Sequence, residues 1–454
     1  MTKKKFIQDF FTFWIIIFLL IIYLSNLALN INMNFDVHIV ITFAIIGVIT
    51  IYNIFKDKRK YSLNKTFWYF NLFFFFIAPI MQYLSNYFPW GYYIDSEIYF
   101  ESNIYLILWL LIYSFTYKLT KDTKETTNIS IGKIDMKFLM ICTIVALILL
   151  ISLIGLSNLL TRETNTIENI DDAMIQSLVD KILRSVPAIS TVIYFINIQK
   201  NNKKINIFYI LIFFIATIIS VFPTSVTRYF MGTVYIGIVL SIFGKKMNNR
   251  TFDLGMIAVF AILFPMFQIF KWYTLSDIIE SGFNFQMFDG VYNNVDFDAY
   301  SMFARIILYV DRFGFTYGNQ ILCTLLFFIP RRFWNSKPIS TGPMVAAAQD
   351  VNFTNLSSPL ISEGYIDFGI FGVILYAIII AFILKKLDTY YWQKKEQELA
   401  IDIVEIVYPF LIGFLIFMLR GSLQPTVVFM FSFFVYVFGI YFLFKKKREK
   451  KWKR

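Results

Sequence analysis

The stretch DVHIVITFAIIGVITIYNIF, residues 36–55, is followed directly by KDKRK, residues 56–60. The first stretch has the length of roughly 20 apolar residues that a helix needs to cross a hydrocarbon core of about 30 Å. The second is rich in Lys and Arg, which concentrate in cytoplasmic loops. An apolar run that ends in a basic cluster predicts a membrane-spanning helix whose carboxyl end lies on the cytoplasmic side.

The same pattern recurs along the chain of 454 residues, of which 58% are hydrophobic and 16% charged. So few charged side chains cannot cover a large water-soluble globule. In lipid every backbone amide needs a partner within its own segment, so the spans must be helices. We therefore predict an all-α polytopic integral membrane protein of about twelve transmembrane helices. They are expected at residues 9–29, 36–55, 66–84, 102–118, 138–157, 185–199, 205–222, 229–244, 252–271, 367–384, 403–419 and 427–444.

Charge predicts the orientation of these spans. If the N-terminus is inside, the two tails and the even-numbered connections hold 31 of the 42 basic residues. That excess indicates cytoplasmic termini and a cytoplasmic (cell) membrane location. The basic start Met1–Lys5 resembles that of a signal peptide, but the apolar run after it continues too far, so we interpret it as the first span.

One large outer loop is predicted late in the chain. Residues 317–330 are apolar but short, and treating them as a span would move the basic tail outside. We therefore expect residues 299–311 and 317–330 to be interfacial helices within the loop. The chain then divides into residues 1–271 with nine spans, 272–366 with the loop, and 367–454 with three spans and the tail.

Arginine is concentrated on the predicted outer side, where it makes up 8 of 11 basic residues against 4 of 31 inside. A guanidinium grips phosphate or carboxylate at two points, whereas lysine is a hydrated point charge. This pattern favours an anionic ligand outside the membrane. The alternative is that these arginines pair with loop carboxylates or lipid headgroups. They are Arg162, Arg184, Arg228, Arg305, Arg312, Arg331, Arg332 and Arg420.

Two stretches near the end of the outer loop carry a resemblance. The first is IPRRFWNSKP, residues 329–338, and the second is EGYIDFGIFG, residues 363–372. Together they resemble the Wzy-type oligosaccharide repeat-unit polymerases, the O-antigen and capsular polysaccharide polymerases, in which a Pro-Arg…Trp…Lys-Pro segment precedes a Glu-x-Tyr-x-Asn-Phe-Gly-x-x-Gly segment. Arg331 and Gly342 also have the Arg-x10-Gly spacing of some members, whereas Asp367 stands in place of the family's Asn. The many-span layout with one large outer loop is similar to the GT-C-like polymerase and ligase architecture.

The resemblance implies that a glycan is transferred from an undecaprenyl-diphosphate carrier onto another lipid-linked repeat unit, with release of undecaprenyl diphosphate. Preorganised arginines can stabilise this leaving group without a metal as the anomeric carbon gains oxocarbenium character. A carboxylate beside apolar surface can serve as base for the acceptor hydroxyl, and we expect this base to be Glu363. The expected substrate-binding residues are Arg331, Arg332, Lys337, Arg228, Arg420, Arg305, Arg312, Tyr365 and Asp367.

The second stretch also predicts an anion site from its residues alone. The tenth span is expected to begin near Asp367, so its N-terminal amides face outward and favour negative charge. Gly364, Gly369 and Gly372 allow a ligand or a neighbouring helix to approach closely. Alternatively, the glycines serve only packing and Glu363 complements the helix dipole.

Asp296 and Asp298 form an Asp-x-Asp pattern of the kind that binds metal-nucleotide sugars. Nucleotide sugars are cytosolic, so we interpret this tripeptide as a solvated or sugar-facing loop. No metal or other cofactor is expected. The expected partners are lipid-linked glycans, membrane lipids, a chain-length regulator and a flippase, and no nucleic acid.

Three other functions remain open. A glycan ligase would share the architecture, but such relatives carry a histidine in the outer loop and residues 272–366 contain none. A flippase or exporter of lipid-linked glycan would line its path with charged side chains, whereas the predicted spans are almost free of them. A structural subunit of an assembly complex would tolerate mutation of Glu363 or Arg331.

Overall fold

The computed structural model describes residues 12–17, 20–21, 24, 35–122, 130–132, 134–160, 173–201, 204–266, 294–349, 353, 356–395 and 401–444. These residues are almost entirely helical, and nine helices among them are long and apolar enough to cross a membrane. The chain is thus an all-α polytopic membrane protein, as predicted. Two shorter apolar helices, Ile207–Ser220 and Arg228–Phe243, match two further predicted spans. The predicted span at 9–29 lies largely outside the described residues, and the number of twelve stays a prediction.

Contacts divide the chain into two compact units that are discontinuous in sequence. The first unit comprises Met1–Lys121, Met247–Lys385 and Leu415–Val427, and the second comprises Asp122–Lys246, Lys386–Phe414 and Val428–Arg454. The predicted division at residues 271 and 366 was based instead on the side of the membrane where each segment is expected to lie. It stays a prediction.

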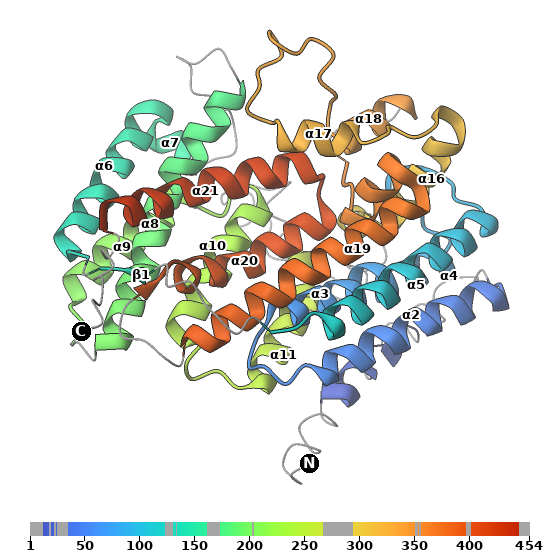
Figure 1. Cartoon of the computed structure of the whole chain (residues 1–454), viewed down its shortest axis with the longest axis horizontal. Coiled ribbons are helices and arrows are strands. Elements are labelled where there is room, and N and C mark those ends of the chain that lie inside the picture. Colours follow the sequence, from blue (N-terminus) through green and yellow to red (C-terminus); the bar gives the residue numbers. More distant parts are fainter. Residues whose placement is uncertain are drawn as a thin grey trace, which may run out of the picture. The chain divides into compact units, whose positions relative to one another are not determined.

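Three spans of the first unit pack against one another (Figure 1). Helix α2 (Val37–Lys56) packs against α5 (Ser96–Leu119) and α3 (Leu63–Leu72). A hydrogen bond of 2.8 Å from Asn103 Nδ2 to Thr42 Oγ1 joins α5 to α2. The span of α3 continues through a π-helical segment, η1 (Phe73–Ile77), into α4 (Ala78–Leu84).

Helix caps explain where these spans begin. Asp95 Oδ1 accepts a hydrogen bond of 2.9 Å from Ile98 N, so α5 begins at Ser96 rather than at the predicted residue 102. The predicted boundary was wrong because the first turns carry Glu97 and Glu101, which lowered the apolarity but not the helicity. Ser62 caps α3 in the same way by accepting from Lys65 N at 3.0 Å.

A second π-helical segment faces the first. Helix α11 (Asn249–Ala258), η3 (Val259–Leu263) and α12 (Phe264–Met266) form one candidate span. Phe260 in η3 packs against Phe73 of η1 at a ring-centroid distance of 5.4 Å. One turn of each helix is therefore widened where the two spans meet.

The same two spans share a buried ion pair. Lys65 Nζ lies 2.8 Å from Asp253 Oδ1, and the two side chains are 0% and 6% exposed. Lys65 also hydrogen-bonds to Asn249. Because both charges are removed from water, each depends on the other.

We expect Lys65→Met to lower the free energy of unfolding by about 3–5 kcal/mol, because it leaves the Asp253 carboxylate buried without its cation. The double variant Lys65→Met/Asp253→Leu should recover most of that loss. Thermal unfolding of the detergent-purified protein measures both, with Lys58→Met, at an exposed lysine, as the control. A Lys65→Met protein as stable as Lys58→Met would contradict the coupling.

Short helices gather at the end of the first unit where α4 ends, which is called the loop-side end below. Helix α16 confirms the predicted helix at 299–311, but every residue from 299 to 307 is buried, so its first half packs inside the protein. Helix α17 covers only part of the predicted 317–330, because Gly318 starts it and turns follow Leu325. The elements here are η2 (Pro89–Gly91), η4 (Val295–Phe297), α16 (Ala299–Phe313), α17 (Asn319–Leu325) and α18 (Thr341–Ala348).

Helix α19 (Leu360–Lys395) is broken at Phe368 and Gly369, where Gly369 has φ 59° and ψ −139°. A Cβ on Gly372 would lie 1.8 Å from the Gly364 carbonyl oxygen. Residues eight apart in a continuous helix are about 12 Å apart, so residues 360–367 fold back onto the long helix after Gly369. The long helix thus starts at the break, within two residues of the predicted start near Asp367, and Glu363 lies in a short helical segment before it rather than in a loop. The predicted close approach at the glycines is confirmed.

The second unit is a helical bundle with one small sheet. Strands β1 (Ser130–Ile131) and β2 (Ile401–Asp402) pair antiparallel. Helix α8 packs against α6, α9 and α10. The helices α20 and α21 each have one end in the first unit and the other in the second. The helices are α6 (Met136–Ile154), α7 (Leu156–Leu160), α8 (Ala173–Asn201), α9 (Ile207–Ser220), α10 (Arg228–Phe243), α20 (Ile403–Arg420) and α21 (Leu423–Phe444).

Candidate functional site

The second stretch of the family resemblance is held at the loop-side end of the first unit by a residue that follows the first stretch. Thr341, three residues after the first stretch, donates a hydrogen bond of 2.7 Å from Oγ1 to Glu363 Oε2 in the second. Gly342 N, next along the chain, donates to Ser422 Oγ at 3.3 Å. Segments from α18, α19 and the α20–α21 turn are thus held together around Glu363.

Glu363, the predicted base, is 3% exposed. Its other carboxylate oxygen, Oε1, accepts a hydrogen bond of 3.1 Å from the backbone N–H of Leu423, the first residue of α21. A carboxylate at this place complements the partial positive charge of the helix end. Glu363 is therefore fixed in position by two donors, and it also caps a neighbouring helix.

Asp367 is fully buried and also caps a neighbouring helix. Its Oδ1 accepts from Thr316 Oγ1 at 2.5 Å and from Gln320 N at 3.2 Å, and its Oδ2 accepts from Ile321 N at 3.0 Å. Three donors converge on two carboxylate oxygens at the start of α17. An asparagine offers only one acceptor oxygen, which gives a physical reason for Asp where the family has Asn.

We expect Asp367→Asn to lower the free energy of unfolding by about 1–3 kcal/mol, because the amide NH₂ faces backbone donors that then lack an acceptor. Thermal unfolding of the purified protein measures the loss. Asp311→Asn, at an exposed position of α16, is the matched control. Equal stability of the two variants would mean that the Asp367 carboxylate is not needed as a cap and would favour its predicted contact with substrate.

Arg420 is paired with acids that the sequence analysis placed in a solvated loop. Its Nη2 lies 2.8 Å from Asp298 Oδ1 and 3.8 Å from Asp296 Oδ1, and its Nε donates to the Asp296 carbonyl at 2.8 Å. Asp296 and Asp298 are 2% and 0% exposed, so of the two interpretations the solvated loop was wrong, and the sugar-facing loop stays a prediction. The ion-pair alternative for the outer arginines applies to Arg420.

Arg305 is buried on α16 beside this ion pair. Its Nε donates to Gln349 Oε1 at 2.9 Å, and its guanidinium lies 4.6 Å from the centre of the Tyr92 ring. Burial lowers the pKa of Arg305 to about 10, against the opposing effects of Tyr92 and Asp298, so the side chain stays charged at neutral pH. Its Nη2 has no hydrogen-bond partner among the described residues. That leaves a charged donor available to a ligand oxygen.

Two cationic side chains in the segment 327–338 donate hydrogen bonds to backbone carbonyls of the same segment. Lys337 is 7% exposed, and its Nζ donates to the carbonyls of Phe327 at 2.7 Å and Ile329 at 2.8 Å. Arg331 donates from Nη1 to the Lys337 carbonyl at 2.6 Å. Arg331 also donates from Nη2 to the Pro338 carbonyl at 3.1 Å, so both of its Nη atoms contact the backbone although the side chain is exposed. Lys337 and Arg331 thus both stabilise the segment.

Two further predicted arginines are exposed at the loop-side end. Arg312 and Arg332 lie over the rings of Phe313 and Phe333 at 5.2 and 4.6 Å. Tyr365 is instead 5% exposed and packs against the Tyr105 ring at 5.1 Å. Arg312, Arg331 and Arg332 are therefore the exposed guanidinium groups of the predicted set.

Of the remaining predicted arginines, two lie in the second unit and one lies outside the described residues. Arg228 lies in the second unit at the start of α10. Arg184, also in the second unit, is 1% exposed and donates from Nε to Asp180 Oδ1 at 2.5 Å. Arg162 lies outside the described residues.

Sequence reasoning missed Asp298 and Thr341 as parts of the site. Asp298 accepts from Trp90 Nε1 at 2.9 Å and from Ser357 Oγ at 2.9 Å, besides its pairing with Arg420. Trp90 has φ 64°, a strained conformation for an aromatic residue. Only the Asp-x-Asp pattern signalled Asp298, and nothing in the sequence signalled Thr341.

The described residues contain no group of three or more His, Cys, Asp or Glu side chains that could hold a metal ion. The chemistry available at the loop-side end is that of a fixed buried carboxylate, a buried Arg–Asp pair and exposed guanidinium groups. Comparison with protein-family models, with curated proteins and with solved structures gives no match for the chain.

Proposed function

We propose that the chain is a polysaccharide polymerase. It joins undecaprenyl-diphosphate-linked oligosaccharide repeat units by metal-independent glycosyl transfer on the outer face of the cytoplasmic membrane. The observation that carries the proposal is that Glu363 in the second family-like stretch is held by Thr341, three residues after the first stretch, although the two residues are 22 positions apart in sequence. The hydrogen bond supports a site to which both parts of the chain contribute.

In this proposal the exposed guanidinium groups bind the diphosphates. Arg332 lies over the ring of Phe333, which is 72% exposed and can contact the lipid carrier or the bilayer. Planar guanidinium groups bind phosphate oxygens in pairs, and they stabilise charge that develops on the leaving diphosphate. The buried Nη2 of Arg305 can bind a further ligand oxygen.

Glu363 acts as the base in this proposal. It takes the proton of the acceptor hydroxyl as that oxygen forms its bond to the anomeric carbon and the bond to the diphosphate breaks. Thr341 Oγ1 and Leu423 N keep the carboxylate in one orientation. Fixed orientation is what a base needs in order to face a bound hydroxyl.

The test is deletion of the gene in its host, followed by complementation with wild type or with Arg331→Ala/Arg332→Ala. The control is Lys204→Ala/Lys246→Ala, which removes two exposed charges elsewhere. Surface polysaccharide and carrier-linked glycan are analysed by size, and the amount of each protein is measured. We expect the arginine variant to lower polymer about 10²- to 10⁴-fold, because the loss of one charge-assisted hydrogen bond at each arginine costs about 1.5–3 kcal/mol.

The size and location of the carrier-linked glycans in the deletion strain distinguish a polymerase from a ligase and from a flippase. Single repeat units that accumulate on the outer face while polymer disappears support the polymerase. Long polymer on the carrier would identify a ligase, and single units on the cytoplasmic face would identify a flippase. Either of these two results would overturn the proposal.

A further inference from the structure

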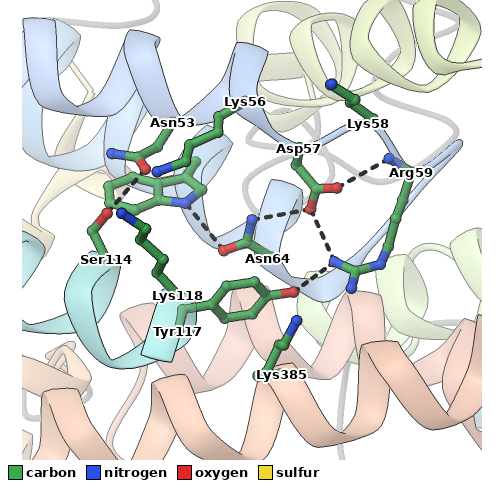
Figure 2. Close-up of a pocket in the computed structure, with 11 residues that line it drawn as sticks. Asn53, Lys56, Asp57, Lys58, Arg59, Asn64, Ser114, Tyr117, Lys118 and Lys385 are labelled. Atoms are coloured by element: carbon green, nitrogen blue, oxygen red, sulfur yellow. Dashed lines mark hydrogen bonds and ion pairs between the residues drawn. The ribbon is translucent and has the colours of Figure 1, made fainter. Parts of the chain in front are cut away.

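A basic cavity of about 550 Å³ lies in the first unit, at the end opposite the loop-side end (Figure 2). It is enclosed by the carboxyl end of α2, the start of α3, the carboxyl end of α5 and residue Lys385 of α19. Ligand sites commonly measure roughly 300–1,000 Å³, so the cavity has room for a small molecule or a lipid headgroup. Its lining residues are Asn53, Lys56, Asp57, Lys58, Arg59, Asn64, Trp68, Ser114, Tyr117, Lys118 and Lys385.

The lining carries four lysines and one arginine but a single acid, Asp57. These cations come from three connections that are far apart in sequence, and all three were predicted to be cytoplasmic. Like charges that converge on one space repel each other unless an anion lies between them. The fold therefore concentrates positive charge here rather than dispersing it.

The single acid is already fully engaged. Asp57 accepts hydrogen bonds from Ser62 Oγ at 2.7 Å, from Asn64 Nδ2 at 3.0 Å and from Arg59 N at 3.0 Å. Burial raises the pKa of Asp57, but Arg59 and these donors outweigh burial and hold the pKa below its usual range. Asp57 stays ionised at neutral pH, and it orients Arg59 rather than neutralising the lysines.

Three of the four lining lysines are exposed. Lys56, Lys58 and Lys118 are exposed, and none of the described residues forms an ion pair with them. Lys385 Nζ lies over the Tyr117 ring at 5.5 Å, and Tyr117 OH accepts from Arg59 Nη1 at 2.7 Å. In the view of Figure 2 the ends of Lys56 and Lys118 lie on the Ser114 side of the cavity, and Lys385 lies below Tyr117.

We propose that the basic cavity binds a phosphate-bearing anion, either an anionic lipid headgroup or a soluble diphosphate compound. The cavity is formed at the ends of candidate membrane spans, where headgroups lie. Basic pockets between such helix ends attract phosphate groups, and each lysine near an anionic surface contributes roughly a fivefold gain in affinity. The site is separate from the loop-side residues of the proposed polymerase.

Native mass spectrometry of the full-length, detergent-purified protein tests the proposal with three probes: phosphatidylglycerol, zwitterionic phosphatidylcholine and inorganic diphosphate. The variant is Lys56→Gln/Lys58→Gln/Lys118→Gln, and the charge-matched control is Lys137→Gln/Lys204→Gln/Lys246→Gln, at three exposed lysines elsewhere. All six side chains are exposed, so both proteins should fold, and thermal unfolding verifies this.

The triple cavity variant should bind its anion on the order of a hundredfold more weakly than wild type, with the control within about twofold. Weakened binding of phosphatidylglycerol alone identifies a lipid headgroup, and weakened binding of diphosphate identifies a soluble phosphate compound. If the wild type, the variant and the control bind phosphatidylglycerol equally well, and likewise bind diphosphate equally well, the proposal is overturned. Because no loop-side residue is changed, this result is independent of the polymerase test.

Discussion

Glu363→Gln is expected to lower the rate of polymer formation by about 10²- to 10⁴-fold, the usual contribution of a general base. Glutamine has the same shape and can still accept from Leu423 N while Thr341 Oγ1 accepts from its amide. The helix cap is therefore kept while the base is lost. Thermal unfolding should show a change of less than about 1 kcal/mol, since neither hydrogen bond is left unmade.

The matched control is Glu97→Gln, at an exposed glutamate near the start of α5. It should polymerise at the wild-type rate. Glu363→Ala removes both the base and the cap, so it should lose stability as well as activity. If Glu363→Gln polymerises at the wild-type rate and only Glu363→Ala fails, then Glu363 is a cap without a chemical role.

The largest effect on folding is expected from Gly372→Ala. A Cβ at this position would lie 1.8 Å from the carbonyl oxygen of Gly364, and no rotamer can relieve a clash between Cβ and backbone. The hairpin of α19 would have to open, and with it the placement of Glu363 and Asp367. We expect a loss of more than about 3 kcal/mol in unfolding free energy, measured as folded protein recovered from the membrane and as melting temperature.

Gly255→Ala is the control for this prediction. Gly255 lies in α11 of the same unit, and a Cβ there meets no atom within 4 Å. Alanine favours helix by up to about 1 kcal/mol over glycine, so this variant should be as stable as wild type or slightly more stable. A Gly372→Ala protein that folds as well as Gly255→Ala would mean that residues 360–367 do not fold back onto α19.

The spans could be predicted from sequence because a helix in lipid is specified locally. The apolar run that ends at Lys56 predicted α2 to within a residue or two at each end. The short helix of residues 360–367 that folds back onto α19 could not be predicted, because only the contact between Gly364 and Gly372 reveals the reversal.

The site was harder to predict because its contacts join distant parts of the chain. Glu363 was identified, but its partner Leu423 is 60 positions away. Arg420 was identified as a cation, whereas the acids that it pairs with precede it by more than 120 positions. Residue type alone does not tell an arginine held by buried carboxylates, such as Arg420, from an exposed one, such as Arg332. Only tertiary packing decides that difference.

The most direct test of the central claim is a reaction with purified protein. The full-length chain is reconstituted into liposomes with undecaprenyl-diphosphate-linked repeat units as the sole substrate and without added divalent metal. The account predicts carrier-linked dimers and longer polymers, with one undecaprenyl diphosphate released for each linkage formed. The account would be contradicted if the purified, folded protein left the repeat units unjoined while membranes of the host polymerised the same substrate.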